Sequence, residues 1–390
     1  NPSPERILER QAMKTQGLTL RLRFLQSVYS NIVQTLTGLD TAALTTIVKS
    51  IGQPAYRGKQ LADSIYTQRV RSIDEITTLP VALRQSLSET YTIGSCTVIG
   101  KQEAVDGTIK YLLSFNDGEV VETVFLPYEN RTSICISSQV GCPMGCSFCA
   151  TGTEGLVRNL TTAEIIDQLL IVQALQPEKR ISHVVMMGMG EPLLNLSCVI
   201  EALTLMANEM GLSWRHLTVS TVGVIPAIEK LAQMDLPLTL AVSLHAPTDD
   251  LRDELVPLNR KHNIARLMQA CSEYVYQTNR RLTFEYVLLA GVNDRDEDAH
   301  ALGKLLAKQP LCALNTIPYN STDVEAAYKR PQSASTRRFR DIVASYGVTV
   351  TQRQERGQKI AAACGQLKRS ALRSGHSLIP LQMLKADALA

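Results

Sequence analysis

The sequence predicts an α/β protein whose largest domain is a partial barrel of six βα units, a (βα)6 arrangement. Between residues 133 and 353, short apolar runs of strand-like composition alternate with longer amphipathic segments. The chain has 390 residues, enough for a large domain and a smaller one. Its 45% hydrophobic and 20% charged residues are ordinary for a globular protein. No apolar run approaches the length of a membrane-spanning helix, so no membrane partner is expected.

Six strands and six helices account for the alternation. The strands are expected at Ser133–Ser137, Ile181–Met187, His216–Ser220, Leu238–Leu244, Leu282–Leu288 and Leu311–Ile317, and the helices near 161–175, 194–210, 224–234, 264–278, 296–308 and 333–346. Thr161 and Glu164 open the first helix as a capping box, and Gly211 is placed to stop the second. Repeats of this length imply a parallel sheet curved into a partial barrel, with the chemistry at the carboxyl ends of its strands.

A helical unit is expected at residues 36–95, ahead of the barrel. Apolar residues recur there at helical spacing, and Gly52-Gln53-Pro54 and Leu79-Pro80 separate the helices. Its basic residues fit a solvated helix surface or an RNA-facing patch equally well; they are Arg57, Lys59, Arg69 and Arg71. The net charge of +3 neither implies nor excludes a nucleic-acid partner.

A β-hairpin extension is expected at residues 96–130. This segment alternates as strands do, with turns at Asp106-Gly107 and Asp117-Gly118. The barrel domain, with a catalytic C-terminal loop, then spans residues 131–369. The terminal segments 1–35 and 370–390 show no usable pattern.

Four of the nine cysteines lie close together in C-I-S-S-Q-V-G-C-P-M-G-C-S-F-C, which begins at Cys135. Cys142, Cys146 and Cys149 form a C-x3-C-x2-C set. Soft thiolates at such spacing bind iron–sulfur clusters or zinc. A zinc site normally takes four protein ligands, so three thiolates favour a [4Fe-4S] cluster with one iron open to another ligand. An odd number of cysteines, crowded in this way, argues for a reducing compartment and against a secreted disulfide framework.

Polar residues follow several of the later strands. They are Gly190 and Glu191 in G-M-G-E-P, Ser220, the run Ser243-Leu244-His245, and Asn315. Each alone is often a structural residue, but together they predict a ligand held at the barrel mouth. His245 fits an acid, a base, a donor to a ribose or a structural hydrogen bond.

Cys364 lies in a small-residue stretch surrounded by Lys and Arg residues. Nearby cations favour the nucleophilic thiolate, and small neighbours leave it accessible. The same cations are suited to RNA phosphates.

With V-V-M-M-G-M-G-E-P-L-L-N, S-L-H-A-P, L-T-F-E-Y-V-L-L-A-G-V-N-D and A-C-G-Q-L, these motifs resemble those of the RlmN-type radical S-adenosylmethionine (SAM) family. Members of this family are dual-specificity adenine-C2 methyltransferases of 23S rRNA and tRNA. The resemblance runs from about residue 38 to 369 and implies a barrel of the radical SAM type. It also implies the roles of three sets of residues. The cluster ligands are Cys142, Cys146 and Cys149; the SAM contacts are Gly190, Glu191, Ser220, Ser243, Leu244, His245 and Asn315; and the catalytic residues are Cys364, Cys135 and Glu122. A lone Glu in an apolar strand, such as Glu122, says little without the resemblance.

The mechanism that the resemblance implies uses two SAM molecules per turnover. One methylates Cys364, and the other, on the [4Fe-4S] cluster, yields a radical that activates the methyl group for addition to C2. Glu122 then takes the C2 proton, and Cys135 resolves the adduct by forming a disulfide with Cys364. The cycle needs an electron donor such as flavodoxin or ferredoxin and a thiol reductant.

Two other functions fit the same motifs. A C8-adenosine methyltransferase of the same superfamily shares the cluster, the paired cysteines and A-C-G-Q-L, although segments such as G-Q-P-A-Y-R-G-K-Q-L favour C2. A non-catalytic, zinc-containing RNA-binding protein would need neither Glu191 nor the two catalytic cysteines.

The compartment is expected to be cytoplasmic, with a plastid or another bacterial-type organelle as the alternative. The chain begins with Asn1, so its true start is expected to lie upstream. The basic residues of the first 24 positions faintly resemble the end of a transit peptide.

Overall fold

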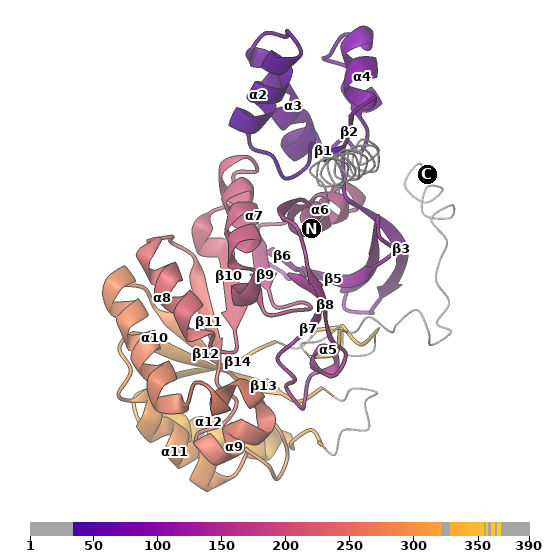
Figure 1. Cartoon of the computed structure of the whole chain (residues 1–390). Helices are drawn as coiled ribbons and strands as arrows, with labels where there is room; N and C mark the ends of the chain where they lie inside the picture. The colour runs from indigo at the N-terminus through magenta and orange to yellow at the C-terminus, as the bar shows by residue number, and fades with distance from the viewer. Residues whose placement is uncertain (1–33, 321–327, 355, 358–359, 363–364, 368–390) are drawn as a thin grey trace, which may run out of the picture.

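A ten-stranded mixed sheet forms the centre of the protein (Figure 1). The computed structural model describes residues 34–320, 328–354, 356–357, 360–362 and 365–367. Seven strands run parallel; they are β6 (Thr132–Cys135), β9 (His183–Met186), β10 (Leu217–Thr221), β11 (Thr239–Ser243), β12 (Leu282–Leu288), β13 (Cys312–Pro318) and β14 (Thr349–Gln352). The described part of the sheet is open, with β14 at one edge and β3 (Cys96–Glu103) at the other.

Helices connect the parallel strands, as βα units require. The long ones are α6 (Thr162–Leu175), α7 (Leu196–Asn208), α8 (Ile225–Gln233), α10 (Ile264–Thr278), α11 (Asp296–Leu306) and α12 (Ser333–Ala344), with the short α9 (Asp249–Leu255) before α10. Neighbours pack in pairs, α6 on α7, α8 on α10 and α11 on α12. All six predicted strands and all six predicted helices are confirmed, as is the Thr161–Glu164 capping box that opens α6.

The segment predicted as a hairpin continues the same sheet. Its strands β3, β4 (Ile109–Phe115) and β5 (Val120–Pro127) pair antiparallel, and β5 pairs antiparallel with β6. The two predicted turns join these strands at Gly107 and Gly118. Five further strands in the described part of the chain were not predicted: β14, the hairpin of β7 (Gln139–Cys142) and β8 (Gly155–Asn159), and the two-residue strands β1 (Gln34–Thr35) and β2 (Tyr91–Thr92).

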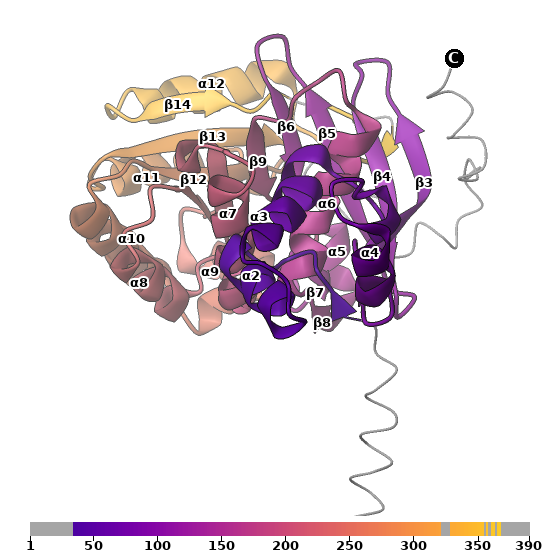
Figure 2. The same cartoon turned by 90° about the horizontal axis from the view of Figure 1, so that it is seen from above.

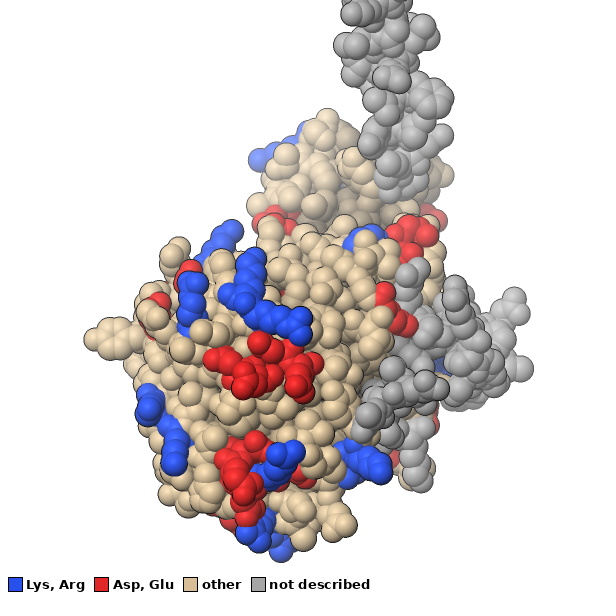
Figure 3. Space-filling model, turned by 60° about the horizontal axis from the view of Figure 1, so that its bottom comes forward, with Lys and Arg blue, Asp and Glu red and all other residues tan. Residues whose placement is uncertain are grey.

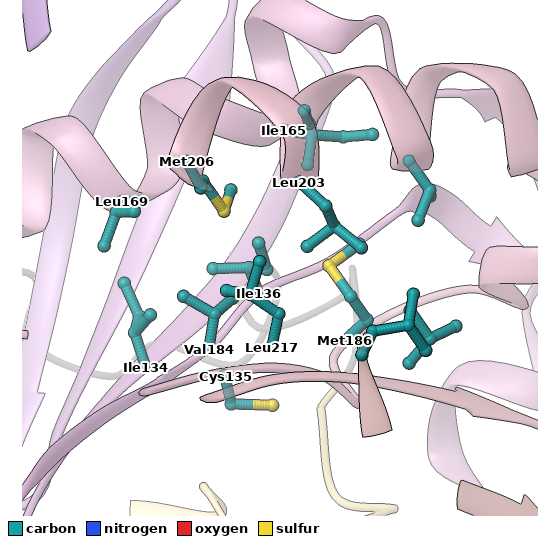
Figure 4. Close-up of a cluster of buried hydrophobic side chains, with 14 of the residues drawn as sticks. Ile134, Cys135, Ile136, Ile165, Leu169, Val184, Met186, Leu203, Met206 and Leu217 are labelled. Carbon is teal, nitrogen blue, oxygen red and sulfur yellow. The ribbon is translucent and has the colours of Figure 1, made fainter. Parts of the chain in front are cut away.

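The core lies between the sheet and the helices. Ile134, in β6, and Ile136, just after it, point toward α6 and α7, whereas the side chain of Cys135 lies on the other side of the sheet (Figure 4). This alternation follows from the period of two along a strand. It divides the sheet into a helix-covered face and an opposite face, which bears the functional side chains.

The helical unit predicted before the barrel is present as α2 (Thr41–Ser50), α3 (Tyr56–Ala62) and α4 (Val81–Ser88), with the two-stranded sheet of β1 (Gln34–Thr35) and β2 (Tyr91–Thr92). Viewed from above, this indigo unit lies on the side of the molecule opposite β14 and α12 (Figure 2). It is anchored by Asp167 of α6, which is fully buried and accepts hydrogen bonds from Arg71 and from the backbone N–H groups of Ser95 and Cys96. Arg71 is therefore a structural anchor, which removes it from the set of candidate RNA contacts.

Candidate active site

The hairpin β7–β8 presents the three clustered cysteines. Cys142 ends β7, and Cys146 and Cys149 follow in the turns before the short helix α5 (Ala150–Thr153). Ser147 fixes the loop by donating its backbone N–H to the Leu255 carbonyl at 3.2 Å. The cysteines therefore project from an anchored loop at the carboxyl end of β6, the edge at which barrel chemistry is expected.

All three thiols line one cavity, here called the three-cysteine cavity, of about 920 Å³ including its mouth. Within the described residues, no group of three His, Cys, Asp or Glu side chains is placed to hold a single metal ion. A cubane cluster binds each thiolate through a different iron, so its ligands lie farther apart than the ligands of one ion. The donor set therefore fits a [4Fe-4S] cluster better than a structural zinc ion, which would need four converging ligands.

Burial favours the neutral form of Cys142 and Cys146 when no metal is bound. It raises the pKa of Cys142 to about 12 and raises the pKa of Cys146 well above its ordinary value, with Cys149 and Glu191 adding to the effect as nearby acidic groups. Buried thiolates of this kind need a cationic centre to compensate their charge, and a metal centre supplies it.

Glu191 joins two loops that line the three-cysteine cavity. Its carboxylate is buried and accepts hydrogen bonds from the backbone N–H groups of Leu193 and Val222, at 3.0 and 2.8 Å. Burial raises its pKa to about 7. Each carboxylate oxygen retains further acceptor capacity, so a ligand amine can still be bound.

The glycines of G-M-G-E-P are required by close chain approach. A Cβ atom at Gly188 would lie 2.7 Å from the backbone of Ile136, and one at Gly190 would lie 2.8 Å from the backbone N of Gln139. Gly190 also has a φ of +105°. These glycines therefore bring the β9 loop against the segment after β6, in addition to leaving room for a ligand.

His245 is a neutral hydrogen-bond donor at the cavity wall. Burial lowers its pKa to about 3, and its Nδ1 accepts from the Val287 backbone N–H at 3.0 Å. Because Nδ1 is an acceptor, the ring proton lies on Nε2. Its ring packs edge-on against Phe148, with ring centroids 4.8 Å apart. Of the alternatives open from the sequence, an acid role at neutral pH is excluded, and both a structural bond and a ligand-donor role remain.

Ser243 and Asn315 belong to one row across the sheet. The register aligns Ser243 with Glu285 and Glu285 with Asn315 on three adjacent strands, so their side chains share a face. Asn315 donates to Glu285 at 3.1 Å. Gly190, Glu191, Ser220, Ser243 and His245 line the three-cysteine cavity directly. Leu244 is buried beneath it, and Asn315 lines the adjoining cavity inside the barrel, which Glu285 and Arg353 also line.

Arg252 was not singled out from the sequence. It is fully buried and donates to the carbonyl oxygens of Val222, Ser243 and Leu244, which end two neighbouring strands. Arginines are rarely buried so completely. In the sequence, Arg252 lies in the charged run D-D-L-R-D-E-L, which is typical of an exposed helix and does not indicate that the arginine is buried.

A second cavity, here called the Cys135 cavity, has a volume of about 520 Å³ including its mouth. It shares Met187, Ile317 and Arg353 with the three-cysteine cavity as a common wall. Cys135 lines it together with Ala362. Cys364 lies outside the described residues, while its described neighbours Ala362 and Gly365 line the Cys135 cavity and the three-cysteine cavity, respectively.

Glu122 shares a face of the sheet with Cys135. Cys135 pairs with Val124, and Glu122 precedes Val124 by two residues, so all three side chains point to the same side. Thr123, between them, faces the other way and donates to Gln168 on α6. Glu122 is 1% exposed, so the carboxylate is held inside the protein on the functional face.

The C-terminal segment is bonded to the cysteine loop. Ala150, directly after Cys149, donates its backbone N–H to the Gly365 carbonyl at 2.8 Å, and Thr151 Oγ1 donates to the Leu367 carbonyl at 2.5 Å. The two cysteine-bearing segments are thus joined by direct hydrogen bonds.

Family models match two segments of the chain. One, the radical SAM superfamily, matches residues 136–302, and another, the ribosomal RNA large subunit methyltransferase N-terminal domain, matches residues 34–93. A probable dual-specificity RNA methyltransferase RlmN from Thermosynechococcus vestitus is 47% identical over 86% of this chain and 99% of that protein. Its counterpart from Rhodopirellula baltica is 48% identical over 82% of this chain and 86% of that protein. The structure is similar to the crystal structure of a radical SAM methyltransferase from Sphaerobacter thermophilus, with a TM-score of 0.83 and 42% sequence identity. The match covers 86% of this chain and 99% of that chain.

Proposed function

The chain belongs to the RlmN family of dual-specificity RNA methyltransferases, and on that premise we propose that it methylates C2 of an adenosine in 23S-type rRNA and in tRNA through Cys364. It is a radical SAM methyltransferase that uses a [4Fe-4S] cluster and two SAM molecules per cycle. The observation that carries the residue assignment is the common wall between the three-cysteine cavity and the Cys135 cavity. It allows a radical generator and a two-cysteine centre to work on one substrate atom.

Cys142, Cys146 and Cys149 would hold the cluster, which would bind SAM at its open iron and supply the electron that cleaves SAM to a hydrogen-abstracting radical. Glu191 is suited to the SAM amino group because a buried carboxylate favours a cationic partner. His245 Nε2, Ser220, Ser243 and Asn315 offer hydrogen bonds to the remaining polar groups of SAM. Gly190 and Leu244 contribute backbone groups and shape.

Cys364 is proposed to carry the methyl group because C2 of adenine is an electron-poor carbon that does not attack SAM. A cysteine that first takes the methyl and later delivers a methylene replaces one inaccessible step with several feasible ones. Among the described residues, the cations nearest to Cys364 in sequence are Arg353 and Arg356. A positive setting favours the thiolate that must accept the first methyl group.

Glu122 and Cys135 are proposed to release the product. Glu122 accepts the C2 proton of the radical adduct, whose unpaired electron would return to the oxidised cluster, and the Cys135 thiolate then attacks the Cys364 sulfur. A sulfur–sulfur bond forms, the carbon–sulfur bond breaks with its electron pair on the carbon, and a proton completes the methyl group. The disulfide must be reduced by an external thiol before the next cycle. We also propose flavodoxin or ferredoxin as the class of electron donor.

RNA is proposed to approach the Cys135 cavity across an arginine-rich rim. Arg131 and Arg356 lie over the Tyr128 ring, with guanidinium carbons 4.5 and 4.6 Å from its centroid, and Tyr128 and Arg356 line the cavity. Guanidinium and aromatic groups together suit phosphate contact and base stacking. The face at the bottom of Figure 1 carries acidic and basic clusters side by side (Figure 3).

The domain division remains part of the proposal. We assign residues 36–95 as a helical RNA-binding unit, 96–130 as a β extension that carries Glu122, and 131–369 as the radical SAM domain, with 1–35 and 370–390 outside them. No helix in the described part of the chain is long and apolar enough to cross a membrane. We propose a cytoplasmic location, with a bacterial-type organelle as the alternative.

The test is methylation of rRNA and tRNA by anaerobically reconstituted protein, with SAM labelled as CD3. Digestion and mass spectrometry should locate a methyl group at C2. Because one hydrogen is removed from the methyl on Cys364 and one proton is returned, the product should carry two deuterium atoms. A label at C8 would identify the C8 enzyme, and iron-free protein that binds RNA without modifying it would establish the zinc-containing binding protein.

A further inference from the structure

Lys110 is a buried lysine to which the reaction described above assigns no part. Its side chain is 5% exposed, and its ammonium nitrogen lies 2.9 Å from Glu122 Oε1. The same nitrogen lies 3.2 Å from the carbonyl oxygen of Ala361, three residues before Cys364. One cation therefore links the proposed base on β5 to the segment that leads into the proposed methyl carrier.

The register of the sheet places this link on the functional face. Lys110 on β4 lies opposite Val124 on β5, and Val124 lies opposite Cys135 on β6. Glu122 is a diagonal neighbour of Lys110 across the same pair of strands. Lys110, Glu122 and Cys135 thus point to one side of three adjacent strands, away from the core.

The energetics of the pair argue against a purely structural role. Removing two charges from water costs roughly several kcal/mol per ion. Replacing a buried ion pair by two apolar side chains of similar volume therefore often leaves a protein as stable or makes it more stable. The next residue on β5, Thr123, is also buried, but it makes a hydrogen bond between neutral groups, to Gln168. A charged pair at this position therefore calls for a functional reason.

We propose that Lys110 is a positioning residue that keeps Glu122 ionised and ready to accept the C2 proton, and that holds the segment before Cys364 against it. This inference rests on the proposed function. In the step concerned, the C2–H bond of the radical adduct breaks and the proton moves to the Glu122 carboxylate. The bonding electron pair stays in the adenine ring, and the unpaired electron of the adduct would return to the oxidised cluster.

Few other described ionisable groups lie on the elements around this pair. β6 carries Cys135, β7 carries Cys142, and the segment after β14 carries Arg353 and Arg356. Asp106, in the β3–β4 turn, accepts from the Gly357 backbone N–H at 3.1 Å, and its own carbonyl accepts from Arg356. Lys110 is in ion-pair contact with Glu122.

The decisive variant is Lys110→Met, which keeps an unbranched side chain only one atom shorter and removes its charge. A buried carboxylate without its cation favours the protonated form at neutral pH. Glu122 then cannot take the C2 proton, so covalent protein–RNA adduct should accumulate at least tenfold over wild type at pH 7. At pH 9 the carboxylate ionises again and the adduct should resolve. Lys110→Arg should behave as wild type.

Three comparisons make the result unambiguous. Glu122→Gln should accumulate adduct at both pH values, which separates ionisation of Glu122 from faster attack by Cys135 at high pH. Lys101→Met removes a partly exposed lysine on the adjacent β3 and should leave methylation unchanged. Iron content and SAM binding of each variant report whether the fold and the cluster are intact.

Two outcomes would overturn the inference. One is a Lys110→Met protein that turns over like wild type; the other is one that binds iron and SAM yet forms neither adduct nor product at any pH. A wild-type protein that makes no methylated RNA, or a Cys135→Ala protein that traps no adduct, would instead contradict the proposed function itself.

Discussion

The three-cysteine cavity and the Cys135 cavity share a wall at Met187 and Arg353 but are assembled in different ways. In the first, each polar group follows its own strand, and consecutive βα units deliver the set in chain order. In the second, Glu122 and Cys135 come from the antiparallel side of the sheet, and a segment more than 200 residues later closes it. The cofactor half of the site can therefore be recognised from short sequence motifs. The catalytic half depends on strand register and on contacts between residues far apart in the sequence.

Loss of the cluster should affect both cavities and have the largest effect. Cys146→Ala removes a buried cluster ligand, so methylation should fall by roughly a thousandfold or more. Iron and sulfide analysis of anaerobically reconstituted protein should show the cluster lost along with activity. Cys271→Ala, at a buried cysteine far from the loop in sequence, is the matched control and should retain iron. Full iron content and activity in Cys146→Ala would remove the cluster assignment.

The Cys135 cavity can be disabled while the three-cysteine cavity keeps its chemistry. Cys135→Ala should load iron and SAM normally and trap a covalent protein–RNA adduct, because the step that breaks the carbon–sulfur bond is lost. Cys364→Ala should form neither adduct nor product, because no methyl carrier remains. Denaturing electrophoresis with labelled RNA distinguishes the two. Normal turnover by Cys135→Ala would refute its role as resolving cysteine.

The Asp167 anchor of the helical unit should contribute stability to the whole molecule. Asp167→Ala leaves Arg71 and two backbone N–H groups without their acceptor, and breaking a buried pair typically costs about 3 kcal/mol or more. Arg71 is 28% exposed, which reduces its share of this cost. Urea denaturation of Asp167→Ala, Arg71→Met and the double variant should show strong non-additivity. Additive effects would mean that the two side chains are not coupled.

Glu191, in the three-cysteine cavity, should make the stability of the protein depend on pH. In cluster-free protein its pKa is raised to about 7, above the ordinary value of 4.5, because burial disfavours the charged form. Between these pH values the folded state keeps a proton that the unfolded state has released, so stability falls as pH rises and levels off above about pH 7. The total loss should be at most about 3 kcal/mol. Unfolding free energies at pH 5 and 8 should differ less in Glu191→Gln; an equal difference would exclude Glu191 as the source.

The contrast between the two cavities also explains what the sequence could and could not predict. The parallel strands and their helices follow from hydrophobic periodicity, and the residues after each strand follow from the barrel rule. Glu122 and Cys135 could be identified only by resemblance, because their chemistry depends on which residues lie opposite them. Lys110 was not singled out from the sequence, because nothing nearby in sequence shows that its partner is Glu122.

The missed strands have a similar explanation. β14 has only four residues, largely exposed, in T-V-T-Q, so it lacks the alternation that marks a half-buried strand. The short β7–β8 hairpin lies within the cysteine motif, where the spacing of metal ligands obscured the backbone pattern. The β extension was expected as a separate hairpin, because sequence alternation identifies strands but not the sheet they join.

The hydrogen bond from Thr151 to Leu367 has a consequence for the order in which the protein is made. These residues are 216 positions apart, and ribosomes add about 5–20 residues per second. The cysteine loop is therefore complete roughly 10–40 s before its C-terminal cover has been synthesised. During that interval the loop lacks the segment that is later hydrogen-bonded to it and that contributes Gly365 to the lining of the three-cysteine cavity.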